Sequence, residues 1–451
     1  MPRRHWWGFL TCWLLLAAAE RAGAQGYGVY EQSACAMARA GAAVARPCED
    51  GSAIFFNPAA LAVERDGSKL SIGGTLIGPR GDFTSFDGRV STPMVANWVP
   101  VPAAYYARPT GDRLSLGLGF FVPYGLTTEW PIDFEGRFVS YKTSLQTIYA
   151  QPTIAFKIND HLAIGGGPDL VFSSLELNQR VDLAVQSLAP GITFAQIGVP
   201  PGTDFADLKI SGTDFTLAAH IGLLVRATDT VSFGARYLSR HTIARDDLTL
   251  ESQQVATGLR TPVPLPGIPQ GTPIDTLVAP LFNPGGRLAD QEAATELTVP
   301  DQFVAGVAIQ PTARLTLLAD YQLSTWSVFE NLTFTTTSGV SEVVVKNYRD
   351  TSGVRVGADY RVTDRLAIRA GVLAHQAAAP DGSVTPDLPE GARVEYTAGL
   401  GARLNDRFSL DAAYQYIDQE TRNGRTRFSG PDTGRYAFHA NLFGVSLVTR
   451  F

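Results

Sequence analysis

Apolar and polar residues alternate in short runs along most of the chain, and many of these runs follow a polar turn. In the run LNDRFSLDAAYQY, every second residue from Phe408 to Tyr416 is apolar, whereas Ser409 and Asp411 lie on the opposite face. A period of two residues is typical of a β-strand with one apolar face. The same unit of turn and strand recurs at 110–121, 158–167, 227–237, 311–322, 362–372 and 404–416.

A second alternating run precedes each of these units, so each unit is predicted to be the tight turn of a β-hairpin. The six hairpins supply twelve strands, and one further strand is predicted on either side of them, at 68–78 and 437–451. Fourteen antiparallel strands whose two ends lie on the same side can close into a barrel, and closure removes the unpaired edges that lipid does not tolerate.

The predicted fold class is therefore all-β, a 14-stranded antiparallel transmembrane β-barrel over residues 67–451. Short turns at one end and long loops at the other are typical of such barrels. The longest loops are predicted at 173–213 and 240–298 and are rich in apolar residues, so they form a binding surface, pack on one another as a lid, or do both. A soluble 14-stranded protein is the alternative, but it leaves the export signal and the two-sided alternation unexplained.

Residues 1–24 predict a secretory signal peptide, with Arg3 and Arg4 before an apolar core and a small-residue cleavage site at 22–24. No later stretch is apolar for the 18 residues that a membrane-spanning helix requires. The chain ends in Phe451, and the alternate apolar residues before it resemble the C-terminal signature of bacterial outer-membrane barrels. We therefore expect the protein in the bacterial outer membrane, inserted by the barrel-assembly machinery through Phe451.

Composition excludes several classes of function. The formal net charge is −6 and basic residues do not cluster, which argues against a nucleic-acid partner. No phosphate-binding loop and no metal-binding motif is present, so we expect neither a cofactor nor a metal. In an oxidising compartment Cys35 and Cys48 either form a disulfide or remain as two buried thiols, and the sequence leaves both open.

Residues 25–66 precede the first predicted strand and lack the barrel alternation, being rich in Ala and Gly. A barrel of fourteen strands has a lumen that its own side chains do not fill. We therefore predict that this segment is a plug, or hatch, folded inside the lumen. Asn57 and Pro58 would form a rigid turn in it, because Asn closes turns locally and Pro fixes φ.

The segment resembles the N-terminal hatch of FadL-type outer-membrane transporters for long-chain fatty acids and aromatic hydrocarbons, and the triplet Asn57, Pro58 and Ala59 matches the signature of that hatch. The resemblance continues in order along the mature chain, in LGFFVPYGLTTEWP, LTVPDQFVAGVA, ADYQLSTWSVFENL and NYRDTSGVRVGADY. It implies a monomer whose long outer loops capture a hydrophobic small molecule. The molecule enters a pocket in the lumen and leaves sideways into the lipid of the outer membrane through a kink in the third strand.

The third strand is predicted at 112–121 and runs into FVPYG. A proline cannot donate a ladder hydrogen bond and a glycine permits a bend, so both the residues and the resemblance predict a lateral opening here. The opening is predicted at Phe121, Val122, Pro123, Tyr124 and Gly125. In the alternative interpretation, Pro123 simply marks the end of the strand.

The resemblance also suggests where a carboxylate head group would bind. Arg349 aligns with a basic position that helps hold the carboxylate in fatty-acid members, and Arg180 aligns more loosely. Otherwise each is a loop-edge arginine paired with Asp350 or Asp182. Long-chain fatty acids are therefore the first predicted substrate, and aromatic hydrocarbons, which need no cation, are the alternative.

Three other classes of barrel are considered. A general diffusion porin would require an open polar lumen, which the apolar plug argues against. An outer-membrane enzyme would require catalytic residues, and the chain contains neither a His-Glu-x-x-His nor a Gly-x-Ser-x-Gly motif. Because these motifs are absent, no catalytic residues are predicted. A purely adhesive barrel would not require a plug.

Overall fold

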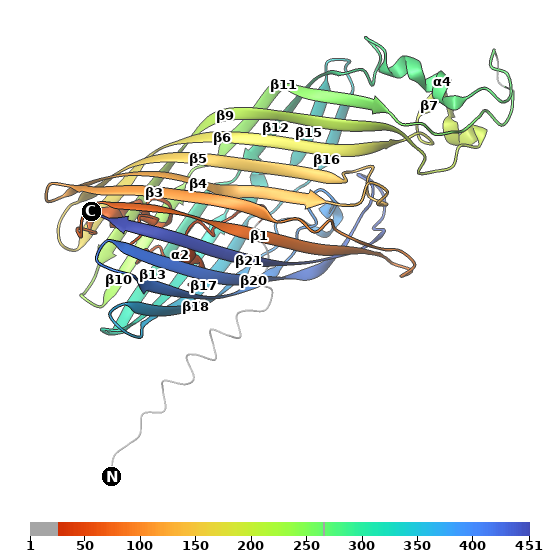
Figure 1. Ribbon diagram of the computed structural model, residues 1–451. Helices are drawn as coiled ribbons and strands as arrows, with labels where there is room; N and C mark the ends of the chain where they lie inside the picture. The colour runs from red at the N-terminus through yellow and green to blue at the C-terminus, as the bar shows by residue number, and fades with distance from the viewer. Residues whose placement is uncertain (1–25, 265–266) are drawn as a thin grey trace.

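Strand formation follows the alternation of the sequence in the computed structural model, which describes residues 26–264 and 267–451 (Figure 1). The predicted signal peptide at 1–24 lies outside these residues. The strands form one closed antiparallel β-barrel of 14 strands, which confirms the predicted fold class. Closure is direct, because β1 pairs along its length with β21 on one side and with β3 on the other.

The barrel strands follow one another around the wall in chain order. Two of them are each interrupted by two residues, so that β10 with β11 and β12 with β13 form single staves of the wall. The strands of the wall are β1 (Lys69–Ser85), β3 (Val99–Thr110), β4 (Leu114–Glu129), β5 (Lys142–Lys157), β6 (Leu162–Asp182), β9 (Asp204–Arg226), β10 (Val231–Leu238), β11 (His241–Gln254), β12 (Gln291–Val299), β13 (Gln302–Thr312), β14 (Leu315–Ser324), β17 (Thr351–Arg361), β18 (Leu366–His375), β19 (Arg393–Arg403), β20 (Phe408–Gly424) and β21 (Gly434–Arg450).

The remaining elements lie in the N-terminal segment and in the long loops. Their short length is consistent with the many Pro and Gly residues of these regions. They are α2 (Ala34–Met37), α3 (Ala53–Phe56), η2 (Pro58–Ala62), β2 (Ser91–Pro93), β7 (Ser187–Ala189), β8 (Ile192–Thr193), η3 (Phe194–Ile197), α4 (Ile274–Val278), η4 (Ala279–Phe282), η5 (Trp326–Val328), β15 (Asn331–Thr336), β16 (Ser341–Val345) and η6 (Asp381–Ser383). Within the described residues, no helix is both long and apolar enough to span a membrane.

The outward face of the wall is apolar, as the alternation predicts for a surface that meets lipid. In the last strand Phe443, Val445 and Leu447 are 49%, 52% and 43% exposed, whereas Leu442 and Val448 beside them are buried. The alternate residues of β21 therefore separate cleanly into a lipid-facing row and an inward row.

The N-terminal segment, residues 26–66, packs against the inner surface of strands all around the barrel, and α2 lies within the barrel in Figure 1. Glycines in the wall make room for it. A Cβ atom at Gly234 would lie 2.0 Å from the Val44 carbonyl oxygen, and one at Gly399 would lie 2.5 Å from the Ala38 Cβ atom. These distances are too short for any side chain, so the wall and the segment fit only because glycine stands there.

Candidate functional site

The ladder between β3 and β4 ends part-way along the two strands. Their last pair is Ala104 with Phe120, beyond which β3 pairs with β1 and β4 pairs with β5. The β4 register shifts between Phe121 and Tyr124, as at a β-bulge. At the long-loop end, the Val95 N–H donates to the Glu129 carbonyl over 2.8 Å. We call the stretch between these two points, where β3 and β4 do not pair with each other, the wall gap.

Prolines make the β3 edge of the wall gap compatible with an unpaired strand. The Val101 carbonyl oxygen lies 2.9 Å from the Cβ position of Gly74 on β1, so the backbone of Val101 faces β1. The backbones of Pro100 and Pro102 therefore face the wall gap, by alternation. Because proline has no N–H, this edge leaves no donor unsatisfied at these two positions.

The five residues predicted for the lateral opening, 121–125, lie at the bulge of β4, and the N-terminal segment bonds to them. The Val29 N–H donates to the Pro123 carbonyl over 2.8 Å, and the Gly125 N–H donates to the Tyr27 carbonyl over 2.9 Å. Phe121 and Tyr124 are buried, each against aromatic rings of neighbouring elements. The N-terminal segment thus supplies hydrogen bonds to residues 121–125 of β4, where β3 supplies none.

A cavity of about 380 Å³ lies between the wall gap, the N-terminal segment and the loop that joins β18 to β19. Such a volume is typical of ligand pockets, which span roughly 300–1,000 Å³. Most of its lining is apolar, and its charged lining residues are Glu31, Glu390 and Arg393. The apolar lining comes from Ile77, Pro79, Val99, Pro100, Val101, Val122, Leu126, Leu145, Leu388, Pro389, Ile417, Phe438, Ala440 and Leu442, among others. We call this space the apolar cavity.

Arg393 is the cation of the apolar cavity, and the sequence reasoning missed it. Its Nε atom lies 2.9 Å from Glu395 Oε1, but that nitrogen makes no hydrogen bond of regular geometry. The spacing of Arg393 and Glu395 places both on the inward face at the start of a strand, which is the signal that could have identified them. A guanidinium with free donors can bind a carboxylate or carbonyl oxygen.

The two arginines predicted from the sequence do not line the apolar cavity. Arg349 is exposed, and its backbone N–H donates to the Ala378 carbonyl over 2.9 Å. Arg180 lies at the long-loop end, where its Nη2 atom is 3.7 Å from Asp207 Oδ2 rather than paired with Asp182. Their head-group role stays a prediction, and the geometry favours Arg393 for it.

Glu390 is held as a buried acceptor at the edge of the apolar cavity. Its carboxylate accepts from the Gly26 N–H at 3.2 Å, the Ala378 N–H at 3.0 Å and the Ala379 N–H at 2.8 Å. Burial raises the pKa of Glu390 above its ordinary value, and these donors oppose that rise.

Asn57 fastens the N-terminal segment to the wall. Its Nδ2 atom donates to the Leu223 carbonyl over 2.9 Å and to the Val44 carbonyl over 2.6 Å, and its Oδ1 atom accepts from the Ala59 N–H at 3.1 Å. Pro58 follows in the first turn of η2, where its missing N–H costs nothing. The three residues of the predicted triplet therefore form one buried cap between the segment and β9.

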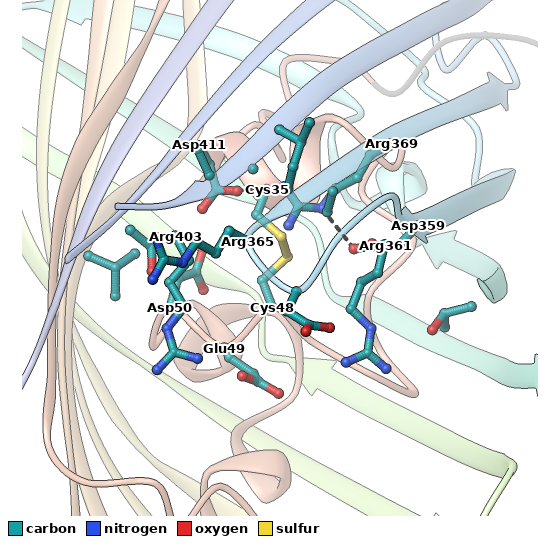
Figure 2. Close-up of a pocket in the computed structure, with 18 of the residues that line it drawn as sticks. Cys35, Cys48, Glu49, Asp50, Asp359, Arg361, Arg365, Arg369, Arg403 and Asp411 are labelled. Carbon is teal, nitrogen blue, oxygen red and sulfur yellow. Dashed lines mark hydrogen bonds and ion pairs between the residues drawn. A yellow bond between two sulfur atoms is a disulfide. The ribbon is translucent and has the colours of Figure 1, made fainter. Parts of the chain in front are cut away.

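A second cavity, of about 530 Å³, opens at the short-turn end of the barrel (Figure 2). More than half of its lining residues are Arg, Asp or Glu, and we call it the polar vestibule. Arg369 pairs here with Asp359 at 2.7 Å and with Asp411 at 2.5 Å. A disulfide joins Cys35 to Cys48 at the wall of this vestibule, with their Cα atoms 6.2 Å apart.

A buried chain of polar side chains in the wall has the order found in hydrolytic triads. Thr153 Oγ1 lies 2.9 Å from His220 Nε2, and His220 Nδ1 lies 2.6 Å from Asp169 Oδ1. A nucleophile needs space beside it for the reacting atom. These residues line neither the apolar cavity nor the polar vestibule, and their hydrogen bonds join β5, β6 and β9.

Comparison with known proteins identifies the family of this barrel. Residues 15–451 match the family model described as outer membrane protein transport protein (OMPP1/FadL/TodX). The chain belongs to this family. It is 22% identical to the long-chain fatty acid transport protein of Escherichia coli O6:H1, with 94% of each chain covered.

Two solved structures share the fold. A Pseudomonas aeruginosa FadL homologue has a TM-score of 0.78 and 24% identity, covering 95% of this chain and 100% of the other. The Ralstonia pickettii toluene transporter TbuX has a TM-score of 0.66 and 19% identity, covering 94% of this chain and 100% of the other. Membership in the family places the protein in the bacterial outer membrane, as predicted, as a transporter of hydrophobic substrates.

Proposed function

We propose that this protein takes up a hydrophobic small molecule through the apolar cavity and releases it sideways into the outer membrane through the wall gap. The observation that carries the proposal is the position of the cavity. Val99 and Val101 on one side of the wall gap, and Val122 and Leu126 on the other, line it together. An apolar molecule in the cavity thus lies beside the break in the β3–β4 ladder.

The charge of the polar vestibule supports the lateral route. A molecule moving straight through the barrel would have to leave apolar surroundings and pass a space lined by ion pairs such as Arg369 with Asp411. Burial of each CH₂ group is worth about 0.8 kcal/mol, so a long alkyl chain in contact with water loses several kcal/mol. Exit into lipid avoids that loss and requires no energy source.

In this proposal residues 25–66 act as the hatch, which closes the lumen at rest and shifts when substrate passes. The buried contacts of the N-terminal segment with strands around the wall support a closed resting state. Asn57, Pro58 and Ala59 hold it in place, so replacing them should impair uptake and leave the barrel folded. We keep the expectations of a monomer and of assembly through Phe451, which is 67% exposed after the end of β21.

Long-chain fatty acids are the first candidate substrates, because Arg393 lines the mostly apolar cavity and a guanidinium can bind a carboxylate. Aromatic hydrocarbons are the second candidate, and a different observation favours them. Glu31 and Glu390 line the same end of the cavity, and Glu395 already pairs with Arg393, so the local charge disfavours an additional carboxylate.

The two candidates separate in a ligand-displacement experiment on the purified protein in mild detergent. A fluorescent fatty acid is bound and competed with oleate or with toluene, using the wild type, Arg393→Ala, Arg349→Ala and the vestibule control Arg403→Ala. Competition by oleate that weakens only in Arg393→Ala supports fatty acids as the substrate. Competition by toluene that no arginine variant affects supports hydrocarbons. No competition by either ligand, with steady ion conductance in a planar bilayer, would replace the proposal with a diffusion porin.

A further inference from the structure

The loop between β18 and β19, residues 376–392, folds inward instead of extending from the barrel. Residues 383–391 are all buried, although they belong to a loop at the long-loop end. Leu388, Pro389 and Glu390 line the apolar cavity from this side. The loop therefore forms part of the cover of the cavity, and we call it the outer lid.

Contacts from three other parts of the chain hold the outer lid down. The Trp130 Nε1 atom donates to the Pro386 carbonyl over 3.1 Å, and Gln419 Nε2 donates to the Pro389 carbonyl over 2.8 Å. Lys346, which is 1% exposed, bonds Asp387 Oδ2 at 2.6 Å. Breaking this buried ion pair is costly, because removing one partner leaves the other charge buried and unpaired.

Glu390 is the point at which the outer lid meets the N-terminal segment. Two of its three donors, Ala378 and Ala379, belong to the outer lid, whereas the third, Gly26, belongs to the segment. The next residue of the segment, Tyr27, accepts through its carbonyl from the Gly125 N–H of β4 at the wall gap. The Glu390 carboxylate thus connects the outer lid with the residues of the N-terminal segment that bond β4 at the wall gap.

We propose that Glu390 is a positioning residue that couples the two closures, so that lifting the outer lid withdraws the acceptor of Gly26 and loosens residues 26–29 from β4. This inference rests on the proposed function. In that function, the coupling would make the entry route under the outer lid and the exit route through the wall gap open together. The coupling itself is a property of the empty protein. It can therefore fail while lateral transport holds, and the reverse is equally true.

The test measures the accessibility of two engineered cysteines to a maleimide in detergent without substrate. Ser383→Cys reports on the outer lid, where the side chain is 5% exposed, and Val29→Cys reports on the segment at the wall gap. Lys346→Met lifts the lid without touching Glu390 or Gly26. Lys209→Met, which breaks the exposed pair with Glu251, is the matched control.

With Glu390 intact, we expect Lys346→Met to raise the labelling rate several-fold at both positions, and Lys209→Met to raise neither. In a Glu390→Ala background, labelling at position 29 should already be fast and Lys346→Met should add to labelling only at position 383. Alanine removes both acceptor oxygens, so the N–H groups of Gly26, Ala378 and Ala379 all lose this partner.

Two results would overturn the coupling. In the first, Lys346→Met raises labelling at 383 but leaves 29 unchanged while Glu390 is present. In the second, it raises labelling at 29 equally with and without Glu390. If Glu390→Ala fails to fold, as judged by loss of the fast-migrating band on unboiled gels, Lys346→Met with Glu390 intact still tests the coupling, because an unchanged labelling rate at position 29 overturns it.

Discussion

The side-chain amide of Gln32 bonds both backbone groups of Val122. Gln32 Nε2 donates to the Val122 carbonyl over 2.7 Å, and Gln32 Oε1 accepts from the Val122 N–H at 3.2 Å. Val122 lies in the bulge of β4, where the register with β5 shifts and β3 no longer pairs. One side chain of the N-terminal segment therefore replaces the neighbouring strand at the kink, and the kink and the segment are expected to move together.

Replacing Gln32 with Leu removes both hydrogen bonds and leaves the Val122 backbone groups without protein partners. Leaving a buried polar group unsatisfied costs about 1–3 kcal/mol, so the kink should open more often in the variant. Hydrogen exchange of peptides covering 26–33 and 118–126 should accelerate in the same variant. Gln376→Leu is the matched control, because it removes an exposed amide that accepts from the Ser352 N–H. Unchanged exchange at 118–126 in Gln32→Leu would contradict this role.

Replacing Gly222 of β9 with Ala tests the packing of the predicted hatch triplet against the barrel wall. The added Cβ atom would lie 2.3 Å from Asn57 Oδ1 and 2.7 Å from the Pro58 Cδ atom, so Asn57 must leave its place. Overpacking of this kind costs roughly 1–3 kcal/mol. We expect the N-terminal segment to become protease-sensitive and uptake to fall, with the barrel still folded on unboiled gels.

The control for that variant is Gly382→Ala, where an added Cβ meets nothing within 4 Å. The double variant Asn57→Ala, Pro58→Ala should reproduce the Gly222→Ala phenotype, because both release the same cap. Normal uptake in the double variant would remove hatch movement from the proposed function.

Removing the disulfide with Cys35→Ser and Cys48→Ser should loosen the N-terminal segment alone. The bridge closes a loop over a sequence separation of 13, for which the chain-entropy model gives about 3 kcal/mol. Arg39, which is 3% exposed, and Arg46 both lie inside that loop. Trypsin should therefore cut the variant there at a lower urea concentration than the wild type. Equal cleavage in both proteins would show that packing, and not the bridge, holds the segment.

The wall was predictable because its signal is local. The period of two in runs such as 404–416 fixes which residues of a strand face lipid, and no distant contact is needed to read it. The kink was predictable for the same reason, since Pro123 and Gly125 act on their own strand. The breaks between β10 and β11 and between β12 and β13 were not predicted, because the hairpin count treats each of these staves as one strand.

The polar end of the apolar cavity could not be predicted in the same way. Glu390 reaches it only because the outer lid folds inward, and that fold depends on Trp130, Lys346 and Gln419, which are far away in the sequence. The sequence predicts a loop near 374–393 but not its direction. The family resemblance indicates Arg349 as a head-group ligand. Because Arg349 lies in a loop, the sequence does not give its distance from the cavity.

Glu64 should make the stability of the protein depend on pH. Burial raises the pKa of this carboxyl to about 7, against the opposing effect of Lys69, whose Nζ atom lies 3.0 Å from Glu64 Oε2. The ordinary value is 4.5, so between these two pH values the folded protein holds a proton that the unfolded chain releases. The contribution of protonated Glu64 is fully present below about pH 4.5. It is lost as the pH rises through about 7, and by linkage the difference approaches about 3 kcal/mol.

Replacing Glu64 with Gln should flatten this dependence, because an amide keeps the shape of the protonated carboxyl and does not titrate. The measurement is the temperature at which the fast-migrating band of unboiled protein disappears, taken at pH 5 and at pH 8. Asp229→Asn, in an exposed turn, controls for the loss of an acidic group. A wild-type transition temperature that does not fall from pH 5 to pH 8 relative to Glu64→Gln would show that Glu64 stays ionised beside Lys69.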